Sequence, residues 1–125
     1  MIDHVSISVS RLAESADFYE QVLRKIGFTR LIDRRSTVGF GKRYPEFWLN
    51  ARSEMAPVGD NSGNHVCLRA PNQSAVKAFH ETALNCGGRD AGAPGFRKVS
   101  TTVYYGAFIY DLDGNKVEAV TFPNE

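Results

Sequence analysis

Two stretches of the chain alternate between apolar and polar residues and begin in the same way. The first is DHVSISVS at residues 3–10, and the second is NHVCLRAP at residues 64–71. A period of two predicts strands with one apolar face, which Val5, Ile7 and Val9 share in the first strand. His4 and His65 fall on the opposite, polar face of their strands.

Each predicted strand is followed by a stretch with helical periodicity. In the first stretch the apolar positions are Leu12, Ala16, Tyr19, Leu23 and Ile26. This spacing forms one apolar stripe, which can be buried against the apolar face of the strand. We expect Ser10 and Asn72 to be the N-caps, with the helices ending near Gly27 and at residues 87–88. His80, in the second helix, is expected to be exposed.

Further strand-like runs follow both helices. In the first half they cover residues 28–34, 36–41 and 46–51, and in the second half residues 102–111 and 115–122. The GAPGFRK run at residues 92–98 is expected to be a loop because it is rich in glycine and proline. DLDGN at residues 111–115 predicts a hairpin turn, since Asp-Gly favours the tight turns between antiparallel strands.

The two halves are copies of one module. Subtracting 61 maps His65, Val66, Phe79, Glu81, Leu84 and Gly88 onto His4, Val5, Phe18, Glu20, Leu23 and Gly27. The match needs no gap, so chance is a poor explanation. We therefore predict an α+β fold in a single domain of residues 1–125. Module one covers about 1–51, the linker about 52–63 and module two about 64–125, and each module is a strand and a helix followed by about three strands.

Composition narrows the function classes. The chain has 125 residues, of which 42% are hydrophobic, and its 15 basic and 14 acidic residues give a formal charge of +1. Such a balance predicts neither nucleic acid nor a membrane surface as partner. With only two cysteines, no signal-type start and no long apolar run, we expect a cytoplasmic protein.

The polar face of the strands carries a candidate metal site. If the two modules are related by an approximate two-fold axis, His4 and His65 can approach each other, and imidazoles suit divalent transition metals. The last predicted strand offers Glu118, between two apolar residues, as a carboxylate ligand on the same face. The alternative is that each histidine simply begins a strand and stays half exposed.

The chain resembles the vicinal oxygen chelate superfamily, which contains glyoxalase I, extradiol dioxygenases, and fosfomycin and bleomycin resistance proteins. The resemblance lies in IDHVSISVSRLAESADFYEQVLRKIGF, NHVCLRAPN and YYGAFIYDLDGNKVEAV, although Leu112 stands where the family usually has proline. It implies two βαβββ modules in a mixed sheet that curls around a cavity, often completed by a homodimer. It also implies that His4, His65 and Glu118 are three of four metal-ligand positions.

The fourth ligand position departs from the family pattern. An offset of 70 places Trp48 opposite Glu118, and tryptophan cannot bind a metal. Glu46 or water is left to fill that position. This makes glyoxalase I a weaker match than the superfamily. Phe108 stands where the dioxygenases have a tyrosine, and the tail after Glu118 lacks the basic residues of the fosfomycin enzymes.

Several other side chains are candidates for binding a small-molecule substrate. They are Trp48, Tyr105, Ser6, Arg69 and Cys67, each of which also has an ordinary structural interpretation, in the core or at the sheet edge. Arg69 is suited either to an anionic substrate group or to a place at the edge of the sheet.

Two functions from different classes follow. The first is a metal-dependent lyase or isomerase of the glyoxalase type, in which Glu118 is the catalytic base and Zn, Fe, Mn, Ni or Co chelates vicinal oxygens of the substrate. Extradiol dioxygenase and thiol transferase are variants of this hypothesis. The second is a non-catalytic protein of the bleomycin resistance type that binds a drug or metabolite. Retention of His4, His65 and Glu118 favours the enzyme.

Overall fold

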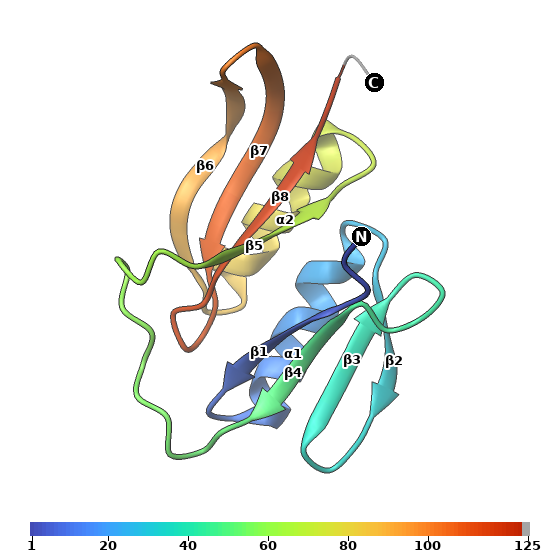
Figure 1. The fold of residues 1–125 in the computed structure, drawn as a ribbon, viewed down its shortest axis with the longest axis vertical. Helices are drawn as coiled ribbons and strands as arrows, with labels where there is room; N and C mark the ends of the chain where they lie inside the picture. The colour runs from blue at the N-terminus through green and yellow to red at the C-terminus, as the bar shows by residue number, and fades with distance from the viewer. Residues whose placement is uncertain (124–125) are drawn as a thin grey trace.

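The computed structural model describes residues 1–123 as two successive βαβββ modules (Figure 1). The first module comprises β1 (Val5–Val9), α1 (Leu12–Arg24), β2 (Thr29–Asp33), β3 (Thr37–Gly41) and β4 (Phe47–Ala51). The second comprises β5 (His65–Arg69), α2 (Gln73–Asn85), β6 (Arg89–Val99), β7 (Thr102–Tyr110) and β8 (Lys116–Thr121). The predicted α+β class and the two-module organisation are confirmed.

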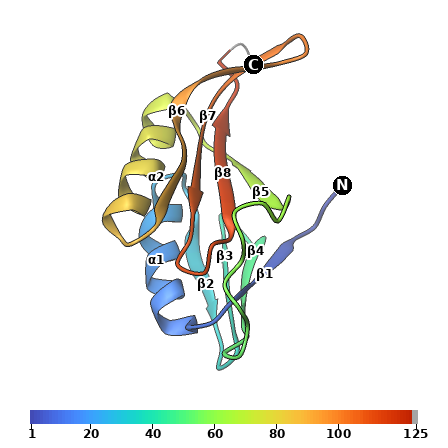
Figure 2. The same cartoon turned by 90° about the vertical axis from the view of Figure 1, so that its left-hand side faces the viewer.

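Each module forms its own mixed sheet of four strands. The strand orders are β1-β4-β3-β2 and β5-β8-β7-β6, and in each sheet the first strand pairs in parallel with the last. Both helices cover one side of the sheets (Figure 2). The opposite side is therefore left for the polar faces that the alternation predicts.

The repeat seen in the sequence is also a repeat in structure. Helices α1 and α2 have 13 residues each and begin 61 positions apart, at Leu12 and Gln73. Ser6 pairs with Trp48 across β1 and β4, and Cys67 pairs with Glu118 across β5 and β8. Trp48 and Glu118 therefore occupy equivalent positions, as the offset of 70 predicts.

The core lies between the helices and the sheets. Tyr19, Phe40 and Phe47 are fully buried in the first module, and the Tyr19 and Phe47 rings are 5.1 Å apart. Burying an aromatic side chain of this kind contributes about 2 kcal/mol. Phe18 reaches from α1 toward the second module, where a Cβ on Gly88 would lie 3.1 Å from its ring. The two modules therefore pack into a shared core.

The turn between β7 and β8 fastens the second module to the first. Tyr19 donates its hydroxyl proton to Asp111 at 2.7 Å, and Ser10 donates its backbone N–H and its hydroxyl to Asp113. Asn115 donates to the Ser8 carbonyl at 2.9 Å. Burial raises the pKa of Asp111, and burial beside Asp111 raises the pKa of Tyr19 well above its usual value. The DLDGN stretch is thus a clamp between modules as well as a turn.

This clamp explains one wrong prediction about capping. Asn72 caps α2, accepting a hydrogen bond from the Ala75 amide at 2.9 Å as expected. Ser10 does not cap α1, whose N-cap position is Arg11 with no side-chain bond. The Ser10 hydroxyl donates to Asp113 instead, so its position is set by the contact between modules rather than by the end of the helix.

The stretch at residues 92–98 is strand rather than the expected loop. It belongs to β6, which pairs with β7 from Arg89 to Val99 with register shifts between Asp90 and Gly92 and between Gly92 and Gly95. As the outer strand of its sheet, β6 tolerates Pro94, which has no N–H to donate. Glycine and proline here mark bulges in an edge strand.

His80 is buried, contrary to the expectation of exposure. It is 8% exposed, and its Nε2 lies 2.8 Å from Oδ1 of Asp90 on β6. Its partner Asp90 lies on β6, and the sequence does not predict a strand at that position. The sequence therefore gives no indication that His80 faces a strand. The pair joins α2 to β6.

The His80–Asp90 pair predicts a dependence of stability on pH. Hydrogen bonds from His80 and from the Gly92 amide hold the pKa of Asp90 below its usual value. The stability that the carboxylate contributes is therefore present above about pH 4 and is lost as the pH falls through the lowered pKa. We expect Asp90→Asn to reduce the free energy of unfolding by less than about 1 kcal/mol at pH 6, because the carboxylate is largely exposed.

Urea denaturation between pH 6 and pH 3 measures this effect. The difference between wild type and Asp90→Asn should shrink toward pH 3. A difference that stays constant across this range would contradict the assignment. Glu81→Gln, at an exposed glutamate on α2, serves as the control.

Candidate functional site

Glu118 lies at the centre of the polar face of the second sheet. It belongs to β8, between β5 and β7, and only 4% of it is exposed. His65 Nε2 lies 3.2 Å from Glu118 Oε1. Because the side chain of His65 is 44% exposed, the pair connects a buried carboxylate to solvent.

Two further polar side chains lie close to Glu118. Cys67 is exposed as a residue, but its thiol is hydrogen-bonded to Glu118, and desolvation together with that carboxylate raises the pKa of Cys67 to about 12. Desolvation and the negative charge of Glu118 also raise the pKa of Tyr104. Both groups therefore keep their protons at neutral pH and can act as hydrogen-bond donors.

His4 does not join His65 and Glu118 within the described chain. It precedes β1, it is exposed, and its Nδ1 lies 2.8 Å from Oδ1 of the neighbouring Asp3. In residues 1–123, no group of three or more His, Cys, Asp or Glu side chains is arranged to hold a metal. One chain thus brings together two of the three ligands predicted from the sequence.

The equivalent position in the first module is filled by Trp48. Its ring lies over Gly39, where a Cβ would be 3.0 Å away, and the Arg34 guanidinium carbon lies 5.5 Å from the ring centroid. Ser6, next to Trp48 in the sheet, is exposed. The polar face of the first module therefore presents an aromatic surface where the second presents a carboxylate.

The two other predicted substrate residues differ in position: Tyr105 lies away from Glu118, whereas Arg69 is near enough to Cys67, the partner of Glu118, to act on its pKa. Tyr105 is 6% exposed and belongs to the hydrophobic core with Ala107, because alternation along β7 directs it to the opposite face from Phe108. Arg69 lies at the end of β5, with its guanidinium carbon 4.5 Å from the centroid of the Phe122 ring.

Residues that sequence reasoning did not select also form part of this face. Phe108 pairs with Glu118 across β7 and β8, and its ring is surrounded by Arg97, Lys116 and His65. Lys116 could have been found, since it shares the parity of Glu118 in a strand. Arg97 could not, because the glycine and proline around it predict a loop rather than a strand.

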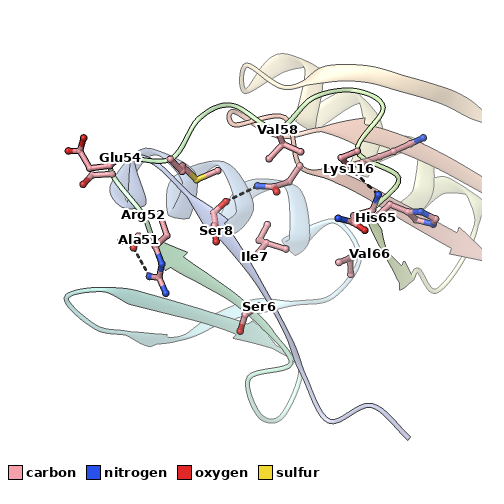
Figure 3. Close-up of a pocket in the computed structure, with 15 residues that line it drawn as sticks. Ser6, Ile7, Ser8, Ala51, Arg52, Glu54, Val58, His65, Val66 and Lys116 are labelled. Atoms are coloured by element: carbon pink, nitrogen blue, oxygen red, sulfur yellow. Dashed lines mark hydrogen bonds between the residues drawn. The ribbon is translucent and has the colours of Figure 1, made fainter.

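A cavity of about 930 Å³ lies beside the site, where the two modules meet (Figure 3). Ser6 and Ser8 of β1 form one wall, His65 and Lys116 form another, and the linker residue Arg52 lies at its edge. This volume is sufficient for a small organic ligand. The cavity therefore connects the polar residues of β1 with the end of the strand that carries His65.

The chemistry of these donors suits a divalent transition metal. Imidazole and carboxylate are ligands that such ions prefer, and a buried carboxylate is stabilised by a positive charge. Two protein ligands are in contact in one chain, and a third would have to come from outside it. Without a metal, the pair can still hold a proton and position a polar ligand.

Comparisons with known proteins agree with this architecture. Residues 1–119 match the family model of the Glyoxalase/Bleomycin resistance protein/Dioxygenase superfamily. Among curated proteins, none matches the sequence. In the described residues, no helix is long and apolar enough to cross a membrane.

Solved structures of similar proteins share the fold. A glyoxalase/bleomycin resistance protein from Albidiferax ferrireducens is 27% identical, with a TM-score of 0.82 over 94% of this chain and 96% of that one. A family enzyme from Burkholderia phytofirmans is 18% identical, with a TM-score of 0.72 over 97% and 98% of the two chains. A protein from Alicyclobacillus acidocaldarius is 14% identical, with a TM-score of 0.71 over 98% and 92%. With its two βαβββ modules and a family match over residues 1–119, the chain belongs to the Glyoxalase/Bleomycin resistance protein/Dioxygenase superfamily.

Proposed function

We propose that the protein is a metal-dependent enzyme acting on a small molecule, with its ion held between two copies of the chain. His65 and Glu118 of one copy and His4 of the other would be the ligands. The observation that carries the proposal is the contact between His65 and the buried Glu118 at 3.2 Å. A carboxylate buried on an otherwise polar sheet face is costly unless a positive charge accompanies it.

The surroundings of His4 support completion of the site by a second copy. Met1 and Ile2, the apolar residues that precede it, are fully and 78% exposed. In Figure 2 this N-terminal segment projects away from the sheets. A second copy packed against it would cover apolar surface and bring His4 to another polar face, which is favourable because buried apolar area stabilises association.

The residues of the chain would then divide the work. A bound divalent ion would supply Lewis-acid stabilisation of negative charge on the substrate. Glu118 would accept and return a proton through a carboxylate oxygen, while the thiol of Cys67 holds that carboxylate in place. Trp48 and Ser6 of the first module would form an aromatic and hydroxyl-bearing wall, and Arg69 would lie at the rim.

Metal analysis of protein purified without an affinity tag tests the proposal. We expect about one divalent ion per chain in wild type and a loss of at least tenfold in His4→Ala, His65→Ala and Glu118→Gln, since each variant removes one ligand of three. Glu81→Gln, at an exposed glutamate on α2, should retain the metal.

A mixed-variant experiment tests whether the site is shared. When His4→Ala and Glu118→Gln proteins exchange subunits, a site shared between copies leaves one intact site in each mixed dimer, about a quarter of wild-type occupancy in total. A site within one chain leaves none. Activity assays on 2-oxoaldehyde–thiol adducts, catechols and epoxides then separate lyase or isomerase, dioxygenase and transferase chemistry.

The second candidate is a non-catalytic protein that binds a drug or metabolite. It is favoured by the absence of a three-ligand group within residues 1–123. Wild-type protein that remains free of metal after incubation with Zn, Mn, Ni, Co and Fe salts would contradict the enzyme proposal and support this one.

A further inference from the structure

Phe108 is the centre of a cluster of positively charged side chains on the polar face of the second sheet. The Arg97 guanidinium carbon lies 5.3 Å, and Lys116 Nζ 4.8 Å, from the centroid of its ring. The His65 ring centroid is 5.6 Å away. Arg97 belongs to β6 and Lys116 to β8, the two strands that flank β7.

Arg97 and Lys116 bring two positive charges to this face, and neither forms a direct ion pair there with another described residue. Asp90 is near enough to be attracted electrostatically by Arg97, but within residues 1–123 no carboxylate lies at ion-pair distance from Arg97 or Lys116. Glu118 supplies one negative charge, but it is buried and contacts His65 and Cys67. Gathering like charges on one face costs free energy, and a bound anion would remove that cost.

Arg97 is held in a fixed position. Its guanidinium donates to the backbone carbonyls of Ala93, Gly95 and Gly106, which leaves two of its five N–H groups for another acceptor. A Cβ on Gly92 would lie 3.1 Å from both the Arg97 Nη2 atom and the Phe108 ring, so the absence of a side chain there makes room for the guanidinium. A donor fixed in advance loses little entropy when it binds an anion.

Lys116 supplies the second donor. It pairs with His65 across β8 and β5, and Figure 3 shows the two side chains extending to the same side. An ammonium group over an aromatic ring directs part of its N–H groups at the ring and leaves the others for a ligand. Arg97 and Lys116 thus present donors from the strands on either side of Phe108.

We propose that Arg97 and Lys116 form a subsite, centred on Phe108, for the oxyanion of a small-molecule ligand, a carboxylate or a phosphate. The subsite adjoins His65, so an anionic group bound there would place the rest of the ligand near Glu118. In assigning this anionic substrate class, the inference rests on the proposed function. Anion binding itself requires no metal.

Calorimetric titration of EDTA-treated protein tests the subsite, with inorganic phosphate and benzoate as probes and benzamide as the neutral analogue of benzoate. We expect phosphate, benzoate or both to bind, benzamide not to bind, and rising salt to weaken the binding. Lys116→Met, which keeps the stem but removes the charge, should raise Kd about tenfold, and Lys116→Arg should restore most of the affinity.

Lys77→Met, at an exposed lysine on α2, is the matched control and should not change Kd. Failure of both probes to bind wild type would overturn the subsite, as would equal weakening by Lys77→Met and Lys116→Met. Metal analysis of the same variants reports separately on the proposed function. Lys116→Met should keep its metal, whereas loss of metal in Glu118→Gln should leave phosphate binding in place.

Discussion

Replacing Asp111 by alanine should lower the free energy of unfolding by about 3 kcal/mol, because it leaves several buried donors without an acceptor. The carboxylate of Asp111 accepts from the Tyr19 hydroxyl, from the Asn115 side chain, and from the backbone amides of Asp113 and Asn115. It is 3% exposed, so water cannot readily replace it. Urea denaturation followed by fluorescence and circular dichroism measures the loss.

Two variants show whether the effect comes from the clamp. Tyr19→Phe removes one of the four hydrogen bonds to Asp111 and keeps the buried ring, so it should cost only about 1 kcal/mol. Asp33→Ala, at an exposed carboxylate, should cost less than about 1 kcal/mol. If Asp111→Ala unfolds at the wild-type urea concentration, the turn does not fasten the modules together.

Replacing Gly114 by alanine should cost about 3 kcal/mol for two separate reasons. Its φ is +93°, a conformation that costs an ordinary residue about 1 kcal/mol. A Cβ there would also lie 2.4 Å from the Val58 carbonyl oxygen, a distance that forces the linker to move. The Val58 amide donates to the Asp113 carbonyl at 2.8 Å, so moving the linker breaks that bond as well.

Gly63 provides a control within the same linker. Its φ is +86°, but a Cβ there would meet nothing within 4 Å, so Gly63→Ala should cost only the conformational term of about 1 kcal/mol. Urea denaturation measures both variants, and limited proteolysis reports on movement of the linker. Equal losses in Gly63→Ala and Gly114→Ala would show that the contact between linker and turn contributes nothing.

The repeating elements were predictable because their signals are local. Alternation and helical spacing identified β1, β5 and both helices, and the offset of 61 matches the interval between α1 and α2. The repeat also predicts that Trp48 and Glu118 occupy equivalent positions in the two sheets, where Trp48 pairs with Ser6 and Glu118 with Cys67. Strand β6 could not be predicted in this way. Its register shifts twice, so its side chains do not keep the period of two by which strands are recognised.

The contact between two of the three candidate ligands could be predicted, whereas the position of the third depends on how the modules are placed. His65 and Glu118 lie on neighbouring strands of one sheet, so strand parity alone directs them to the same face. His4 belongs to the other module, and a repeat does not determine the distance between its copies. The contact between His80 and Asp90 could not be predicted either, because it joins α2 to a strand that the sequence does not indicate.

The sequence by itself determined the elements, their duplication and the polar face that carries His65 and Glu118, because backbone periodicity acts over a few residues. Only the tertiary structure decided that Asp111 binds Tyr19, 92 residues away, and that Arg97 and Lys116 meet at Phe108. These contacts depend on packing between strands and modules distant in the chain. No period along the sequence encodes such packing, and it is the packing that arranges charges into a site.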